Sequence, residues 1–236
     1  MPTVRLADIV RRHGNAYREK HALPMHQHRL LRAIENCRTA ALGGHASQCS
    51  QCGETRVWYN SCRNRHCPQC QSMARAQWLE RRKLELLPVN YFHVVFTVPE
   101  QIAAIALQNK KTVYDILFRA TSETLLTTAS DPRYLGANIG YFAILHTWGQ
   151  NLLHHPHLHC VIPGGGISLG QVPCWVNTKG PNWILPVKVL SATFRKVLLG
   201  MLRKAFKRGE LELFSSLEYL RQPNAFYRYL EPISGS

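Results

Sequence analysis

The sequence has few acidic residues and no long apolar run. It contains 14 Asp and Glu against 29 Lys and Arg. No apolar run is long enough to cross a bilayer, and Met1 to Asp8 lack the charged-then-apolar pattern of a secretion signal. Internal repeats and low-complexity tracts are also absent from the sequence. These absences argue against membrane-spanning and secreted proteins, and we expect a cytoplasmic globular protein of one or two domains.

The shortage of acidic residues leaves a formal net charge of +15 at pH 7 and a pI of about 9.8. The basic residues are spread over several segments and are not confined to a tail, so we expect them on folded faces. A charge of this size favours nucleic acid or another acidic surface as the partner. Simple solubility is the weaker explanation.

Five of the eight cysteines lie between Cys49 and Cys70, in an arrangement typical of zinc sites. Two C-x-x-C motifs each present two thiolates, and closed four-sulfur coordination is structural, not catalytic. The ligand set predicted from this spacing is Cys49, Cys52, Cys67 and Cys70. Substitutes, or ligands for a second ion, are Cys62, His66, Cys37 and His45. Disulfides are the less favoured alternative in a reducing cytosol.

Basic residues alternate with aromatic residues between the two motifs and continue along the helix expected at Gln71–Leu87. This pattern suits phosphate contact and base stacking, although the aromatics Trp58 and Tyr59 could equally pack over a small zinc core. The predicted DNA-binding residues are Arg56, Arg63, Arg65, Arg75, Arg81 and Arg82.

The run from His155 to Gly166 predicts a second metal site. Side chains two apart on a strand point to the same face, so His157 and His159 would lie side by side, with Leu158 facing the other layer. Two such imidazoles suit a divalent metal. His155 has the same parity, but Pro156 interrupts the hydrogen-bonding ladder. The glycines that follow allow a tight turn or the close approach of another backbone. The alternative is a histidine-rich surface loop.

Periodicity predicts an α+β fold in which helices cover an antiparallel sheet. We expect helices over 4–20, from Pro24 to Gly43, over 71–87, from Pro99 to Thr128 and over 191–208. Strands are expected over 91–98 and 139–146 and through the histidine run, with a hairpin partner at 167–175. Pro88 marks the predicted boundary between a helical zinc-binding and DNA-binding domain, 1–88, and a second domain, 89–236.

Four runs resemble the insertion sequence 91 family of rolling-circle transposases. They begin at Cys37 (CRTAALGGH), Tyr59 (YNSCRNRHCPQC), His93 (HVVFTVP) and His155 (HPHLHCVIPGGG). The resemblance covers nearly the whole chain. It implies a zinc-binding domain followed by an HUH single-strand DNA endonuclease domain, HUH meaning His, bulky apolar residue, His. Here these positions are His157, Leu158 and His159.

The resemblance implies a reaction at the ends of a transposon, on single-stranded DNA. The two histidines and a third His, Gln or Glu hold Mg²⁺ or Mn²⁺ on the scissile phosphate, and a tyrosine attacks to give a 5′-phosphotyrosine. The protein would then be cytoplasmic and on the bacterial nucleoid when bound to DNA. Candidates for the third ligand are His155, Gln150, His146 and His93, with His155 favoured by parity.

The sequence departs from the family where the nucleophile should be. The family's Tyr-Leu-x-Arg-Tyr motif does not occur, and Tyr227 and Tyr229 are only weak candidates because residues two apart do not share a helix face. The chain thus resembles a transposase cut short, whose tyrosines, Tyr219 included, pack or lie in a tail. Two alternatives follow: a zinc-dependent DNA-binding repressor derived from a transposase, and a metal hydrolase that uses an activated water.

Overall fold

The computed structural model describes residues 4–149, 153–180 and 185–234. The chain divides into two compact units, Met1–Leu86 and Leu87–Ser236. The division falls close to the boundary expected after residue 88. Each unit is described by itself.

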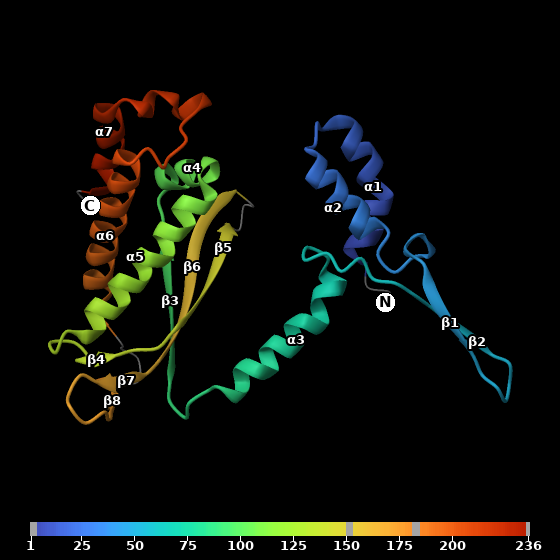
Figure 1. Ribbon diagram of the computed structural model, residues 1–236, viewed down its shortest axis with the longest axis horizontal. Coiled ribbons are helices and arrows are strands. Elements are labelled where there is room, and N and C mark those ends of the chain that lie inside the picture. The colour runs from blue at the N-terminus through green and yellow to red at the C-terminus, as the bar shows by residue number, and fades with distance from the viewer. Residues whose placement is uncertain (1–3, 150–152, 181–184, 235–236) are drawn as a thin grey trace. The chain divides into compact units, whose positions relative to one another are not determined.

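The first unit consists of helices and one hairpin (Figure 1). Its elements are α1 (Leu6–Lys20), α2 (Met25–Glu35), the 3₁₀ helix η1 (Ala40–Leu42), β1 (Gly44–Gln48), β2 (Thr55–Tyr59) and α3 (Pro68–Leu84). The second helix ends at Glu35, earlier than the expected Gly43, and a turn leads into η1. α3 begins with proline at its first position, which the missing N–H of proline allows.

The core of the first unit is small. Its buried members are Ala7, Val10, Ile34, Cys37 and Cys67, so two of the five are cysteines. Between α1 and α2 there are also polar contacts, including an ion pair of 3.3 Å from Arg18 to Glu35. A core with so few aliphatic side chains leaves the cysteines a large share of the stabilisation.

The second unit contains an antiparallel sheet of β3 (Tyr91–Thr97), β6 (His154–Pro163) and β5 (Phe142–Trp148), in the order β3-β6-β5. Its helices are α4 (Glu100–Gln108), α5 (Lys110–Ser130), α6 (Val187–Lys207) and α7 (Pro223–Ser234), with the 3₁₀ helix η2 (Ser215–Arg221) before α7. α4 and α5 contact β6, and α6 packs on α5 (Figure 1). The predicted α+β class, an antiparallel sheet covered by helices, is confirmed.

The central strand β6 has two different faces. Leu158, Cys160 and Ile162 are fully buried in the core, whereas His157 and His159 alternate with them and face the opposite side. Pro156 does not end this strand. Pairing with β3 stops at His157, and β5 has an irregularity between its pairs to His157 and His154, so neither neighbour needs an N–H from residue 156.

A second sheet, β4 (Ala137–Asn138), β7 (Gly165–Ser168) and β8 (Trp175–Asn177), contains the expected hairpin partner. Its glycines are required by close backbone contact, as predicted. A Cβ on Gly165 would lie 2.5 Å from the carbonyl oxygen of Val176, and one on Gly166 would lie 2.5 Å from that of Asn138.

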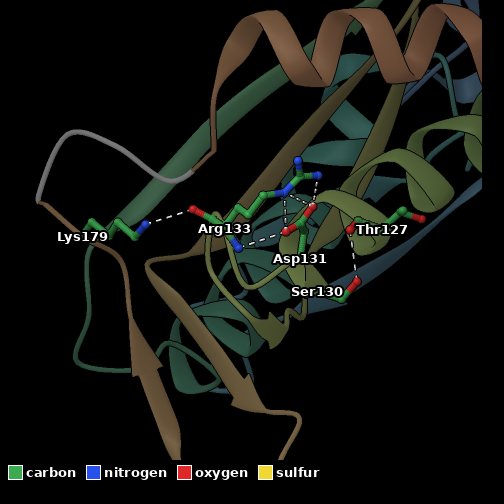
Figure 2. Close-up of polar contacts among 5 residues, drawn as sticks. All are labelled: Thr127, Ser130, Asp131, Arg133 and Lys179. Carbon is green, nitrogen blue, oxygen red and sulfur yellow. Dashed lines mark hydrogen bonds and ion pairs between the residues drawn. The ribbon is translucent and has the colours of Figure 1, made fainter.

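Polar contacts hold the segment after β8 near the end of α5 (Figure 2). The carboxylate of Asp131 accepts hydrogen bonds from the guanidinium of Arg133 at 2.6–3.1 Å. Lys179 Nζ donates to the carbonyl oxygen of Arg133 at 3.0 Å. Among the residues that the structure describes, no helix is both long and apolar enough to span a membrane.

Candidate metal centres

Four thiols converge in the first unit: Cys37, Cys62, Cys67 and Cys70. The Sγ atoms of Cys37 and Cys62 each lie 3.5 Å from that of Cys70, and Cys37 lies 3.6 Å from Cys67. Thiolates around one tetrahedral zinc, with Zn–S bonds of about 2.3 Å, stand about 3.8 Å apart. The cluster therefore has the dimensions of a zinc site.

The cysteine cluster differs from the set that the sequence favoured. Cys67 and Cys70 are present, but Cys49 and Cys52 are exposed in the turn of the β1–β2 hairpin. The substitutes Cys37 and Cys62 take their places. The structure therefore favours Cys37, Cys62, Cys67 and Cys70 as the candidate ligand set.

Backbone geometry brings the two single cysteines to the C-x-x-C motif. Arg38 and Arg63, which directly follow Cys37 and Cys62, have φ values of 58° and 50°. The N–H of Arg38 donates to the carbonyl oxygen of Asn60 at 3.1 Å, at the base of the hairpin. Sharp turns with positive φ are usually predicted from a glycine. Here arginines adopt positive φ, so nothing in the sequence indicated these two turns.

The protonation of the thiols agrees with a metal-binding role. Burial raises the pKa of Cys62 to about 12 and also raises that of Cys37. Burial alone would raise the pKa of Cys70 too, but hydrogen bonds with the thiols of Cys62, Cys37 and Cys67 lower it to about 7. The lowered pKa of Cys70 favours a thiolate beside the other three thiols, and this negative charge would attract a cation.

The second cluster lies on the histidine face of the β3-β6-β5 sheet. Ligand atoms of His146, His157 and His159 all lie within 4.8 Å of one another. His157 and His159 come from β6, as predicted. His146 joins them because its Cα is paired with that of His157 across the β5–β6 ladder. The histidines are therefore strand residues and not part of a surface loop.

Hydrogen bonds leave metal-facing nitrogens free in this cluster. His157 Nδ1 donates to the carbonyl oxygen of His155 at 2.7 Å, which leaves Nε2 as the acceptor. His159 Nδ1 lies 2.7 Å from His93 Nε2, while His159 Nε2 is buried without a hydrogen-bond partner. A buried orphan nitrogen among three imidazoles fits a divalent cation.

The environment of His159 favours its neutral form. Burial lowers the pKa of His159, and the neighbouring His146, His157 and His93 lower it further. A neutral imidazole has the lone pair that a metal needs. His159 can thus bind a cation without first losing a proton at neutral pH.

The other proposed third ligands lie elsewhere. His155, which parity favoured, has its ring centroid 5.4 Å from that of His157 but is not part of the group. His93 lies behind His159 as its hydrogen-bond partner. Gln150 lies outside the described residues. Of the candidates for the third ligand, the structure groups His146, and not His155, with His157 and His159.

The predicted DNA-binding arginines and the substitute ligands His45 and His66 lie outside both clusters. All six arginines lie in the first unit, where Arg82 is partly buried and the other five are exposed: Arg56, Arg63, Arg65, Arg75 and Arg81. His45 stacks on Trp58 at 5.5 Å, and His66 Nε2 accepts a hydrogen bond from Arg65. These two histidines lie in neither cluster.

The C-terminal tyrosines take part in packing. Tyr227 and Tyr229 both pack against the core, and the Tyr229 hydroxyl donates to the carbonyl oxygen of Gln101 at 3.3 Å. Burial, with smaller contributions from Tyr219 and Glu100, raises the pKa of Tyr229. A raised pKa opposes formation of the nucleophilic phenolate.

Comparison with known proteins gives two family matches. Residues 9–98 match the family described as "Transposase zinc-binding domain", and residues 140–235 match "Putative transposase". "Putative transposase y4qJ" of Sinorhizobium fredii (strain NBRC 101917 / NGR234) is 62% identical over 229 residues, 97% of this chain and 57% of the relative. The "Transposase for insertion sequence element IS801" of Pseudomonas savastanoi pv. phaseolicola is 32% identical over 134 residues, 56% of this chain and 32% of the relative. The chain thus spans about half or less of these relatives.

Among solved structures, the conjugative relaxase TrwC in its metal-bound complex with oriT DNA overlaps 48% of this chain and 42% of its own, at 19% identity and a TM-score of 0.37. TrwC complexed with a 27-mer DNA overlaps 59% of this chain and 54% of its own, at 16% identity and a TM-score of 0.38. The family matches and the 62% identical relative agree with the sequence motifs, and the chain belongs to the insertion sequence 91 family of transposases.

Proposed function

We propose that the second unit is the endonuclease part of a rolling-circle transposase, the part that holds single-stranded DNA at transposon ends on a divalent metal, where the DNA is cleaved and rejoined once a nucleophile is in place. The observation that carries the proposal is the group of His146, His157 and His159, with the partnerless Nε2 of His159 among them. Mg²⁺ or Mn²⁺ bound there would neutralise charge on the scissile phosphate and polarise its phosphoryl group.

The chain's own residues hold and orient this site. His157 is fixed by its hydrogen bond to a backbone carbonyl, and His159 by its contact with His93. Such outer partners set the tautomer and direction of a ligating imidazole. Trp148, with 59% of its surface exposed, stacks 6.1 Å from His146 and offers a ring on which a base of the strand can stack.

We infer that the first unit is a zinc-stabilised DNA-binding module. Its ligands would be Cys37, Cys62, Cys67 and Cys70, and a closed thiolate site of this kind holds a fold and does no chemistry. The exposed arginines of the hairpin and α3 would contact phosphates.

We assign the nucleophile to neither Tyr227 nor Tyr229, because both pack against the core. This same observation favours a second function, in which the chain occupies transposon ends without cutting them and represses the complete enzyme. The two functions share DNA binding and metal binding, and they differ in whether a covalent protein–DNA adduct forms.

The test measures metal binding first. Mn²⁺ affinity is followed by electron paramagnetic resonance in the wild type and in His146→Ala, His159→Ala and His155→Ala. Removal of an outer hydrogen-bond partner typically lowers metal affinity about 10–100-fold. We expect His146→Ala and His159→Ala to lower Mn²⁺ affinity by more than this, and His155→Ala to leave it unchanged. Equal losses in all three variants would contradict the assignment of His146.

The second measurement is cleavage. The chain is incubated with single-stranded transposon-end DNA and Mn²⁺, and a covalent adduct is sought on a denaturing gel. We expect slow or absent cleavage with DNA binding retained. An adduct that disappears in Tyr227→Phe or Tyr229→Phe would show that the tail supplies the nucleophile, and would exclude the repressor function.

A further inference from the structure

A cavity of about 540 Å³ lies at the end of β3, beside the histidine cluster. The end of β3 forms one wall with Thr97 and Val98, and α6 forms another with Ser191, Phe194 and Arg195. Its volume lies within the range of small-ligand sites, roughly 300–1,000 Å³. None of the residues assigned to the metal centre lines it.

The floor of the cavity is apolar and its rim is polar. Val98, Phe194 and Leu198 are 2%, 6% and 2% exposed and form the floor. At the rim lie the hydroxyls of Thr97 and Ser191, with Arg195 as the cation. A flat, largely apolar group with a phosphate attached matches this arrangement, because the ring can lie on the floor while the phosphate meets the guanidinium.

One wall of the cavity comes from the C-terminal helix. Pro232 and Ile233 of α7 line it, and the hydrogen bond from Tyr229 to the carbonyl oxygen of Gln101 joins α7 to the start of α4. Gln101 itself lines the cavity. The tyrosine that sequence reasoning offered as a weak nucleophile therefore helps to position this wall.

The cavity is next to the metal centre. His155, which lines it, has its ring centroid 5.4 Å from that of His157. Thr97, which also lines it, is the Cα partner of His157 in the β3–β6 ladder. The cavity thus borders the histidine cluster through His155 and Thr97.

We propose that this cavity binds one nucleobase of the DNA strand, from the nucleotide next to the phosphate at the histidine cluster, with Arg195 contacting that nucleotide's own phosphate. The proposal rests on the proposed function for the presence of a strand at this face. It also explains why His155 shares the parity of the metal ligands without being one: its ring forms the border between the two sites.

Exposed neighbours on α6 supply matched controls. Ser191 lines the cavity and Ala192 does not, although both are exposed. Ser191→Trp therefore places a bulky ring at the mouth of the cavity, and Ala192→Trp adds the same ring outside it. Arg195→Gln and Lys196→Gln each remove one positive charge, but only Arg195 lines the cavity.

The first probe is the set of four deoxynucleoside 5′-monophosphates, observed by saturation-transfer NMR with the full chain. We expect transfer to base protons in the wild type and in Ala192→Trp, and its loss in Ser191→Trp. Absence of transfer in the wild type, or equal transfer in both Trp variants, overturns the proposal.

The second probe is fluorescein-labelled (dT)₁₂, measured by anisotropy. We expect Ser191→Trp and Arg195→Gln each to weaken binding about tenfold, since one stacked base is worth about 1–3 kcal/mol and 1.4 kcal/mol is tenfold. Ala192→Trp and Lys196→Gln should change it less than about threefold. Equal effects within either pair refute the cavity as the site.

Mn²⁺ binding to the same samples separates this proposal from the proposed function. Base-proton transfer together with absent Mn²⁺ binding supports the cavity and refutes the metal centre. Mn²⁺ binding together with absent transfer supports the metal centre and refutes the cavity.

Discussion

Replacement of Cys62 by serine should unfold the first unit, whereas replacement of Cys49 should not. Serine is close to cysteine in size, so the change removes a thiolate ligand with little change in volume. The side chain lost lies 3.5 Å from Cys70 Sγ in the four-thiol cluster. Cys49 is exposed in the hairpin turn and makes no contact with that cluster in the described part of the chain.

The size of the effect follows from the core of this unit. Val10 and Ile34 are its largest buried aliphatic side chains, and each contributes about 1.5–3 kcal/mol. Zinc binding by thiolate sites contributes about 10–16 kcal/mol in zinc-finger peptides at pH 7. A ligand lost from the metal site therefore removes more free energy than this core can replace, and the unit should unfold.

The assay combines zinc content per chain with limited proteolysis. We expect the wild type, Cys49→Ser and Cys52→Ser to retain zinc in the four-thiol cluster and to resist proteolysis in the first unit. Cys62→Ser and Cys37→Ser should lose zinc, and proteases should remove the segment before Leu87 while the second unit survives. Loss of zinc in Cys49→Ser with retention in Cys62→Ser would refute the cluster and restore the set predicted from spacing.

Other parts of the structure give three further expectations. Gly165→Ala should destabilise the second unit by about 1–3 kcal/mol in thermal unfolding, because the new Cβ meets a backbone oxygen, whereas Gly170→Ala, with open space around it, should be close to neutral. Burial lowers the pKa of His154, so the unfolded chain binds this proton more readily; stability should fall as the pH falls through about 6.5, and His154→Gln should reduce that dependence. If Arg75 and Arg81 contact phosphates, replacing both with Gln should reduce the salt slope of single-strand binding by about 1.4, at about 0.7 per contact, and an unchanged slope would remove them from the interface.

Local pattern was enough to predict the histidine strand but not its neighbours. Alternation along one strand places His157 and His159 on one face whatever the rest of the fold does. The third ligand depends on the register between β5 and β6, which aligns His146 with His157. The sequence contains no local signal for that register, so parity pointed to His155 instead.

The cysteine set predicted from spacing differs from the four-thiol cluster for a related reason. Two C-x-x-C motifs suggest one shared ion. However, Cys49 and Cys52 lie in the turn of the β1–β2 hairpin, at the end opposite its base (Figure 1). The single cysteines at that base meet the second motif through turns at Arg38 and Arg63. Arginine is uncommon at positive φ, so these turns could not be predicted from the sequence.

The places of the four cysteines along the chain set an order of folding. Cys67 is the N-cap of α3 and Cys70 lies in its first turn; Cys62 is only 8 residues from Cys70, whereas Cys37 is 33 residues away. Closing the longer loop costs about 1.2 kcal/mol more in chain entropy. Metal capture should therefore begin with the three cysteines near α3, and Cys37 should join last. Because Cys37 follows α2 and is buried in the same core as α1, the docking of both helices would wait for that final ligand.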